Sequence, residues 1–253
     1  MEILVCGKRV PTVGGAITLT ADRRAIDTKA SGFTISPHEE CAVEEAVRLV
    51  ERFGGSVTVV TLGPAIAEEQ LRSCLALGAS GAVLIETEPG VEAGPIATAA
   101  ALHVVAAAGG FDLVLLGNEA SDTGDYQVGI RLAHLLGRPV ATGIKAISVS
   151  DDGSSLSASR TYRGVLETFA LPLPCVVTVK EGINRPRYPS LPGRLRAKRA
   201  PITRVPVGPA DSGDAVMTRL RLPDAPRQQA TVLGHGADAV PALVSVLADI
   251  GVL

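Results

Sequence analysis

The sequence predicts an α/β protein with a parallel sheet, antiparallel edge strands and an extended C-terminal arm that ends in a helix. Strand-like and helix-like segments alternate four times between Met1 and Gly137, the pattern of a parallel sheet with helices on both faces. After Pro139, short strand-like runs are separated by turns such as 151–153. Residues 201–229, rich in Pro, Asp and Arg, indicate a connector. A sheet of this kind is Rossmann-like, and such sheets bind ligands outside the carboxyl ends of their strands.

The elements of the first half follow from the length and period of their apolar runs. Short apolar runs without a helical period indicate strands that are buried on both faces. Longer segments with apolar residues at helical spacing, closed by glycines, indicate helices. We therefore expect strands at 3–6, 56–62, 82–85 and 112–116, and helices at 41–53, 65–77, 95–108 and 125–136.

The second half is expected to add strands to this sheet. Strands are predicted at 142–150, 155–162, 168–173 and 176–179, as antiparallel additions to one edge. We divide the chain into an α/β domain, residues 1–200, and a region 201–253 that holds the connector and a helix at 238–250. A terminal helix on a long arm has little local core, so we expect it to dock on another subunit.

Composition excludes several classes of function. The net charge is -2 and aromatic residues make up 3% of the chain, which disfavours binding to nucleic acid. The apolar runs are too short to span a bilayer, and no secretory signal follows Met1. We therefore expect a cytoplasmic or mitochondrial-matrix-like protein. The four cysteines lack the spacing of a metal or redox motif and are expected to be buried thiols: Cys6, Cys41, Cys74 and Cys175.

The loop at 117–129 is the first candidate binding segment. It leaves an apolar strand, contains three glycines and enters a helix. Glycines at such a junction let the backbone approach a phosphate, which the free N–H groups of a helix N-terminus stabilise. A plain turn between a strand and a helix fits the same residues equally well. Neither a P-loop motif nor the GxGxxG fingerprint occurs in the chain.

The segment 184–199 is the second candidate. Its prolines hold the backbone extended, and Leu191 lies in it with basic residues behind, which suits docking of a protein partner. A solvated basic loop is the alternative. The chain shows no catalytic motif, and its histidines have no nucleophile in a recognisable arrangement. It is therefore interpreted as a binding protein and not as a self-sufficient enzyme.

Several segments together resemble the beta subunits of electron transfer flavoproteins. The opening run Ile3–Val10, the loop and helix from Ser36 to Ala46, the 117–129 loop, the 164–168 hairpin and the run 184–198 match in order and spacing. The Pro-Arg-Tyr-Pro-Ser-Leu-Pro-Gly stretch is the most specific part. The resemblance spans about residues 1–202 and fades afterwards.

The resemblance implies an adenine-nucleotide-binding fold in a heterodimer with an alpha subunit. A redox FAD lies near the interface, and the beta subunit itself holds AMP or, in electron-bifurcating members, a second FAD. Electrons would pass from a flavin-dependent dehydrogenase to this FAD and then to a quinone reductase or another acceptor. Carried over by position, the cofactor-binding residues are Cys6, Ser36, Pro37, His38, Glu39, Leu62, Gly117, Asn118, Ala120, Asp122, Thr123, Gly124, Asp125, Gln127, Val128 and Gly129. The phosphate would lie on the backbone of the 124–129 turn.

The resemblance also assigns a docking segment and shows two departures. Leu191 matches the leucine that docks into dehydrogenases, and we assign Arg187, Tyr188 and Arg194 to the same contact. His38 stands where many members have Phe, either as a replacement of similar shape or as a group that makes the flavin potential depend on pH. Arg163 replaces an acidic residue in the hairpin. The alternative function is a stand-alone AMP- or ATP-binding regulatory module of the same α/β type.

Overall fold

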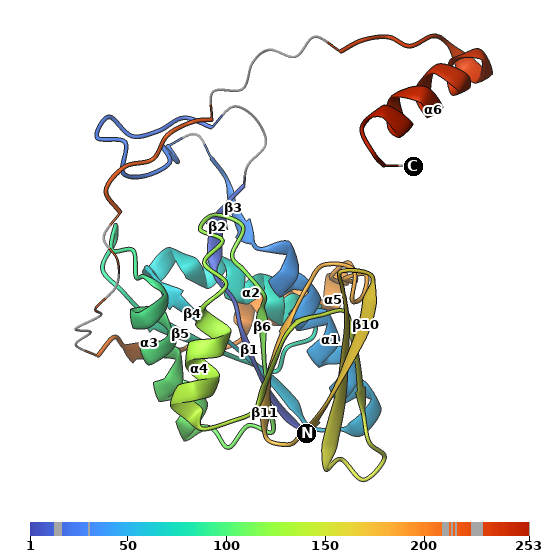
Figure 1. The fold of residues 1–253 in the computed structure, drawn as a ribbon. Helices are drawn as coiled ribbons and strands as arrows, with labels where there is room; N and C mark the ends of the chain where they lie inside the picture. The colour runs from blue at the N-terminus through green and yellow to red at the C-terminus, as the bar shows by residue number, and fades with distance from the viewer. Residues whose placement is uncertain are drawn as a thin grey trace.

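A seven-stranded parallel sheet forms the centre of the molecule, so the predicted α/β class is confirmed (Figure 1). The computed structural model describes residues 1–12, 17–29, 31–208, 213, 215, 217–223 and 230–252. The strands lie in the order β12-β5-β4-β1-β6-β11-β7. Their bounds are β1 Glu2–Cys6, β4 Ser56–Gly63, β5 Gly81–Glu86, β6 Leu113–Gly117, β7 Val140–Ile144, β11 Cys175–Val179 and β12 Thr203–Pro206.

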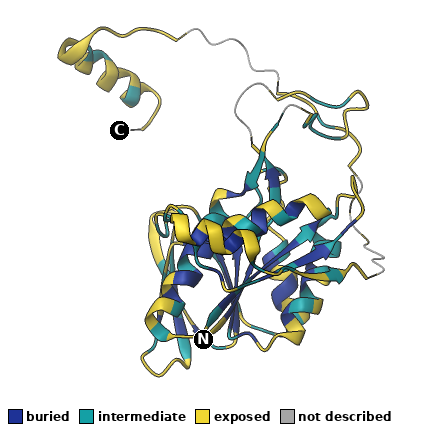
Figure 2. Ribbon diagram, turned by 180° about the vertical axis from the view of Figure 1, so that it is seen from behind, coloured by how far each residue is buried: buried dark blue, intermediate teal, exposed yellow. Residues whose placement is uncertain are grey.

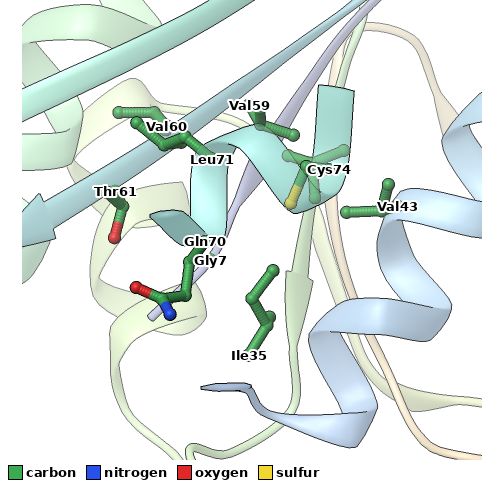
Figure 3. A pocket seen from close by; sticks show the side chains of 10 residues that line it. Gly7, Ile35, Val43, Val59, Val60, Thr61, Gln70, Leu71 and Cys74 are labelled. Carbon is green, nitrogen blue, oxygen red and sulfur yellow. The ribbon is translucent and has the colours of Figure 1, made fainter. Parts of the chain in front are cut away.

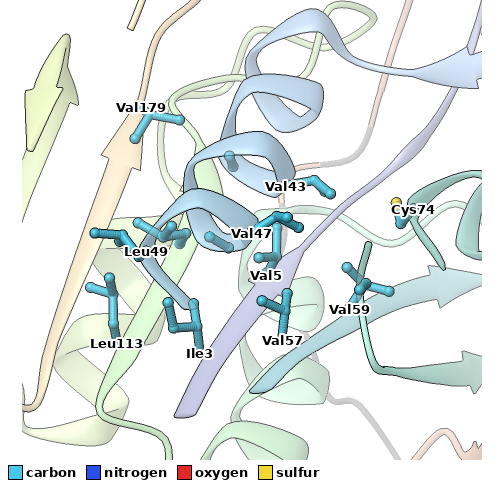
Figure 4. Close-up of a cluster of buried hydrophobic side chains, with 14 of the residues drawn as sticks. Ile3, Val5, Val43, Val47, Leu49, Val57, Val59, Cys74, Leu113 and Val179 are labelled. Carbon is cyan, nitrogen blue, oxygen red and sulfur yellow. The ribbon is translucent and has the colours of Figure 1, made fainter. Parts of the chain in front are cut away.

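Two apolar clusters cover the two faces of this sheet. Along β1, Ile3 and Val5 point into one cluster while Leu4 and Cys6 point into the other, as the alternation of side chains in a strand requires. Figure 4 shows the first cluster, in which residues of β1, β4 and α1 pack together. The first face is covered by α1 (Pro37–Phe53), α2 (Glu68–Leu77) and α5 (Leu191–Arg199), the second by α3 (Pro95–Ala108) and α4 (Val128–Leu136).

The order of the strands reverses beside β1. From β1 the chain passes through α1 to β4 and through α2 to β5 on one side, then returns through α3 to β6 on the other side. β1 and β6 are paired in parallel from Ile3 with Leu113 to Cys6 with Leu116, so both carboxyl ends lie at the same edge. This is the topological switch point, where open α/β sheets bind their ligands.

The second half differs from its prediction in two respects. β11 lies in parallel between β6 and β7, so the expected antiparallel pairing of 176–179 is wrong. All five residues of β11 are buried, which a central parallel strand requires on both faces. The expected strand at 142–150 is divided at Lys145 between β7 and β8. A separate antiparallel sheet is formed by β8 (Ala146–Val149), β9 (Ser155–Tyr162) and β10 (Val165–Pro172).

Some helices begin at other residues than predicted, for identifiable reasons. α1 begins at Pro37, several residues before the predicted start, because proline suits the first turn of a helix. α4 begins at Val128 and not near 125, because Gly124 and Tyr126 have left-handed backbone angles, φ 61° and 58°. α5 lies in a segment that was expected to be extended throughout. A short hairpin of β2 (Arg9–Pro11) and β3 (Phe33–Ile35) stands above the sheet.

The C-terminal region reaches away from the body of the molecule. β12 pairs with β5, so part of the predicted connector belongs to the central sheet. Residues 209–212, 214, 216 and 224–229 of that connector lie outside the described residues. The turn η2 (Gly236–Ala239) and helix α6 (Val240–Asp249) follow, and none of the residues of α6 is buried. Figures 1 and 2 show α6 apart from the sheet and largely exposed. The division of the chain at residue 200 stays a prediction.

We predict that Gly129→Ala destabilises the protein by about 2 kcal/mol through overpacking. A Cβ at position 129 would lie 2.3 Å from Thr178 Cγ2 on β11, and the gain of about 1 kcal/mol in helix propensity does not offset this clash. Urea denaturation measures the loss. Thr178→Ser removes the clashing methyl group and keeps the hydroxyl, so the double variant should recover most of the stability. Without recovery, the contact with Thr178 is not the cause.

Candidate functional site

The predicted cofactor residues gather at the switch point. Cys6 and Gly117 end the paired strands β1 and β6, and Leu62 lies near the end of the neighbouring strand β4. Ser36 precedes α1, and its hydroxyl lies 3.5 Å from the carbonyl of Glu119 in the loop after β6. We call this arrangement the switch-point site: the ends of β1 and β6, residues 36–39 and residues 118–129. Segments far apart in sequence thus meet at one edge of the sheet.

Gly117 allows the first turn of α1 to lie directly against the end of β6. A Cβ at this position would lie 2.7 Å from Glu39 Cγ and 3.1 Å from His38 Cβ. Both distances are shorter than ordinary van der Waals contact, so any larger residue would move the start of α1. The position is therefore restricted to glycine by packing and not by backbone angles.

A chain of hydrogen bonds holds the loop after β6. The backbone N–H of Asn118 donates to the carbonyl of Val179, at 2.9 Å. Thr178 donates its hydroxyl proton to Asn118 Oδ1 at 2.8 Å and accepts from the N–H of Gly143 at 3.1 Å. Thr178 is a site residue that the sequence analysis did not find, and only the position of β11 beside β6 could have indicated it.

Lys8 connects the loop to a buried carboxyl group. Its backbone N–H donates to Glu39 Oε2 at 2.7 Å, and its ammonium group lies 2.7 Å from Asp122. Glu39 is 7% exposed. Burial raises the pKa of Glu39 to about 8, although the hydrogen bond and charge of Lys8 act in the opposite direction. Lys8 was not among the predicted site residues, and its signal in the sequence was a basic residue two positions after the first strand.

The rest of the loop leads into the N-terminus of α4. The N–H of Gly124 donates to the carbonyl of Ala120 at 2.9 Å, which closes a turn whose residues Thr123 and Asp125 are exposed. The first N–H groups of a helix have no partner within the helix, and the helix dipole places positive potential there. Gln127 flanks this end and accepts from Arg131 at 2.8 Å. The N-terminus of a helix can bind an anion through these groups.

His38 lies in the first turn of α1 with its Nδ1 atom buried. This atom is 4.0 Å from Glu119 Oε1 and has no hydrogen-bond partner in the described part of the chain. Burial lowers the pKa of His38, and this outweighs the opposing charge of Glu119. Lys180 and Lys145 also lower it, whereas Glu181 raises it. The imidazole is therefore neutral near pH 7, which favours the interpretation of His38 as a replacement of similar shape.

A small cavity lies beside the site, under the first turn of α2 (Figure 3). Its volume is about 10 Å³, which is room for about one water molecule and far too little for a nucleotide. Gly7, Ile35 and Val43 line it together with Thr61 and Gln70. Thr61 Oγ1 and Gln70 Oε1 are buried and lack hydrogen-bond partners among the described residues. This cavity is therefore not a candidate binding site for a nucleotide.

Comparison with known proteins identifies the family. The family model described as "Electron transfer flavoprotein domain" matches residues 24–210. The chain belongs to the electron transfer flavoprotein beta-subunit family. It is 37% identical to electron transfer flavoprotein subunit beta of Bacillus subtilis over 203 residues, which cover 80% of this chain and 77% of the relative. The subunit beta of Bradyrhizobium diazoefficiens is 38% identical over 88% of this chain and 87% of the relative. The human subunit beta is 34% identical over 99% of this chain and 98% of the relative.

Three structural features bear on the expectations that composition and residue spacing gave. All four cysteines are free and buried. Within the described ranges, no group of His, Cys, Asp and Glu side chains is arranged to hold a metal ion. In the same ranges, no helix is both long and apolar enough to cross a membrane.

In this family member, Arg187 fixes the segment 184–199 to α1. Its guanidinium lies 2.9 Å from Glu44 and 2.6 Å from Glu51, and Arg48 lies 2.6 Å from Glu44 on the other side. Burial acts to raise the pKa of Glu44, but the hydrogen bonds from the two arginines outweigh it and lower that pKa below its ordinary value. Glu44 is therefore an ionised, buried carboxylate. Arg187 is engaged within the chain, and its predicted contact with a partner stays a prediction.

Beyond Arg187, the segment presents apolar side chains from a fixed helix. Tyr188, Leu191 and Leu195 are 95%, 72% and 59% exposed, and the two leucines share one face of α5 at i and i+4. Ser190 accepts from the N–H of Gly193 at 3.1 Å, which caps the helix. A Cβ on Gly193 would lie 2.6 Å from the carbonyl oxygen of Ala76, so α5 packs tightly on α2. Leu195 was not predicted, although its spacing from Leu191 indicates it.

We predict that Arg187→Ala destabilises the protein by about 2 kcal/mol. Removing one partner of a buried pair costs about 3–5 kcal/mol, and the exposure of Arg187 and the remaining Arg48 reduce that figure. Urea denaturation at neutral pH measures it. Arg194→Ala is the matched control, because Arg194 is exposed on the same segment, and its change should stay within about 0.5 kcal/mol. Equal losses in both variants would contradict the assigned role of Glu44.

Proposed function

We propose that this chain is the beta subunit of a heterodimeric electron transfer flavoprotein whose switch-point site binds AMP or a second FAD. Beside it, an alpha subunit holds the FAD that accepts electrons from a flavin-dependent dehydrogenase and passes them to a quinone reductase or another acceptor. The observation that carries the nucleotide part is the convergence of residues 36–39 and 117–129 at the reversal of strand order. Relatives named electron transfer flavoprotein subunit beta support the rest.

The residues present fit a nucleotide in their chemistry. Gly117 and Gly129 allow the first turns of α1 and α4 to lie against strand ends, which brings two helix N-termini to this edge. Lys8 places an ammonium group at the same edge, where it is paired with Asp122. Cys6 and Leu62 supply apolar surface of the kind that a base contacts. When bound, a flavin supplies the redox chemistry, and the chain contributes binding, orientation and electrostatics.

The apolar stripe of α6 supports a contact with the alpha subunit. Val240, Leu243, Val244, Leu247 and Ile250 recur at helical spacing, and none of them is buried. An isolated helix of this length is marginal in water, because its stability normally comes from packing of the apolar face. In this proposal, the alpha subunit covers that face.

The exposed end of α5 supports docking of the dehydrogenase. Tyr188 and Leu191 are apolar or amphipathic groups of the kind that carry binding energy in protein interfaces. Arg194, like other basic residues of α5, is exposed beside them. These charges would orient and accelerate the approach of an acidic surface.

The first test is the content of FAD and AMP in this chain copurified with its alpha subunit. We expect one heterodimer that releases one FAD and one AMP, because the switch-point site is separate from the FAD of the alpha subunit. Two FAD and no AMP would mean that the site holds the second FAD of a bifurcating protein. A flavin-free homodimer that holds AMP or ATP would overturn electron transfer and support the stand-alone regulatory module.

We predict that removal of residues 238–253 weakens the heterodimer, since the apolar stripe of α6 is then lost. Analytical ultracentrifugation over a dilution series measures the change. A sharper version replaces Leu243 and Leu247 with Asp, and the control is Ser245→Asp on the other side of the same helix. The control should assemble normally. Unchanged assembly of the truncated chain would count against docking of α6.

A further inference from the structure

Glu39 is a buried carboxyl group at the centre of the switch-point site. Its backbone is in the first turn of α1, its side chain lies against the end of β6 at Gly117, and its Oε2 accepts from the N–H of Lys8. The site therefore has an acidic side chain where a nucleotide, which is an anion, is proposed to bind. An ionised carboxylate in that position would oppose binding.

The groups that face Glu39 do not supply a free positive charge to offset it. From the loop after β1, Lys8 contributes an ammonium, but this is paired with Asp122 of the loop after β6. From β1 and α2, the facing groups are the thiols of Cys6 and Cys74. Burial raises the pKa of both thiols above its ordinary value, so they stay neutral. The local charge is therefore near zero when Glu39 is protonated and about one negative unit when it is ionised.

We propose that the switch-point site accepts its nucleotide with Glu39 protonated, so that nucleotide binding is linked to the uptake of a proton. This inference rests on the proposed function, and it adds a specificity-determining residue and a pH dependence to that site. Because burial raises the pKa of Glu39 to about 8, the carboxyl is neutral near pH 7 and ionised near pH 9. Binding is then strongest below pH 8 and weakens as the pH rises through this value. By reciprocity, a bound nucleotide raises the pKa of Glu39 further.

A structural role for Glu39 predicts a different pattern. If Glu39 only held Lys8 and packed against Gly117, its replacement would change stability but not the pH dependence of binding. Glu39 also contributes to folding stability, and the direction in which this contribution changes with pH follows from its pKa. The pKa of Glu39 rises from 4.5 to about 8 on folding, so its contribution is greatest below 4.5 and is lost as the pH rises through 8. Glu39→Gln should remove that decline in thermal stability, whichever role is correct.

The experiment is a calorimetric titration of the nucleotide-stripped heterodimer with AMP, and separately with FAD, between pH 7 and pH 9. Phosphate monoesters have their second pKa near 6, so AMP keeps a constant charge over this range. For an apo pKa of 8, we expect the Kd of the wild type to rise about tenfold from pH 7 to pH 9. Titration at pH 8 in two buffers with different heats of ionisation should show uptake of about half a proton.

Glu39→Gln is the matched variant, because its amide oxygen can still accept from Lys8 and its volume is unchanged. Its Kd for AMP should not change between pH 7 and pH 9, and its binding of AMP should take up no proton. The inference is overturned if the wild type binds AMP equally well at pH 7 and pH 9 with no proton uptake. It is also overturned if the Kd of Glu39→Gln for AMP rises with pH as the wild-type Kd does. Proton uptake is measured on the wild-type protein, so it tests the proposal even if Glu39→Gln folds poorly.

Failure of the proposed function looks different from failure of this inference. If the stripped heterodimer binds neither AMP nor FAD at any pH, the nucleotide assignment fails and the proton linkage fails with it. If AMP binds without any dependence on pH, the nucleotide assignment stands and only the role of Glu39 is overturned.

Discussion

The contact between the first turn of α1 and the end of β6 is the constraint on which the site depends. It exists because Gly117 has no side chain, and a Cβ there would lie 2.7 Å from Glu39 Cγ. Gly129 permits the matching contact of α4 with β11. These two glycines bring two helix N-termini to one edge of the sheet, where their dipoles add positive potential. The positive potential at this edge thus follows from packing, without a dedicated phosphate motif.

Helix α1 carries two buried carboxyl groups in opposite states. Glu44 faces Arg48 and Arg187, whose hydrogen bonds outweigh the effect of burial and keep it ionised. Glu39 accepts the backbone N–H of Lys8, whose ammonium is paired with Asp122, so burial dominates and the group is neutral near pH 7. The number of donors to each carboxyl, and not burial alone, decides which one is charged. One helix therefore carries an ion-pair cluster that holds the segment 184–199 and a neutral carboxyl group that lines the switch-point site.

The sequence was sufficient for the fold class and for the segments that form the site, because apolar periodicity and glycines mark strands, helices and their ends. It was not sufficient for the position of β11, since an apolar run such as 175–179 has the same pattern in any buried strand. Thr178 and its bond to Asn118 depend on that position and were missed for the same reason. Arg187 was assigned to a partner because a basic residue beside an exposed leucine has the same sequence signal whether it is free or paired. Glu51 and Glu44, which pair with it, lie more than a hundred residues away in the chain.

The apolar groups left exposed weigh in favour of a heterodimer over a stand-alone module. The apolar stripe of α6 is exposed, and exposed apolar surface of this extent promotes association with another chain. In a protein that functions alone, such a stripe is expected to be buried or replaced by polar residues. The exposure of Leu191 and Leu195 has a different origin, since α5 is held by Ser190 and by its contact with Ala76. A helix fixed in this way cannot turn its leucines inward, so their exposure persists in the free chain. Two exposed apolar surfaces at separate places, one on a detached helix and one on a rigid platform, are expected of a subunit with one permanent and one transient partner.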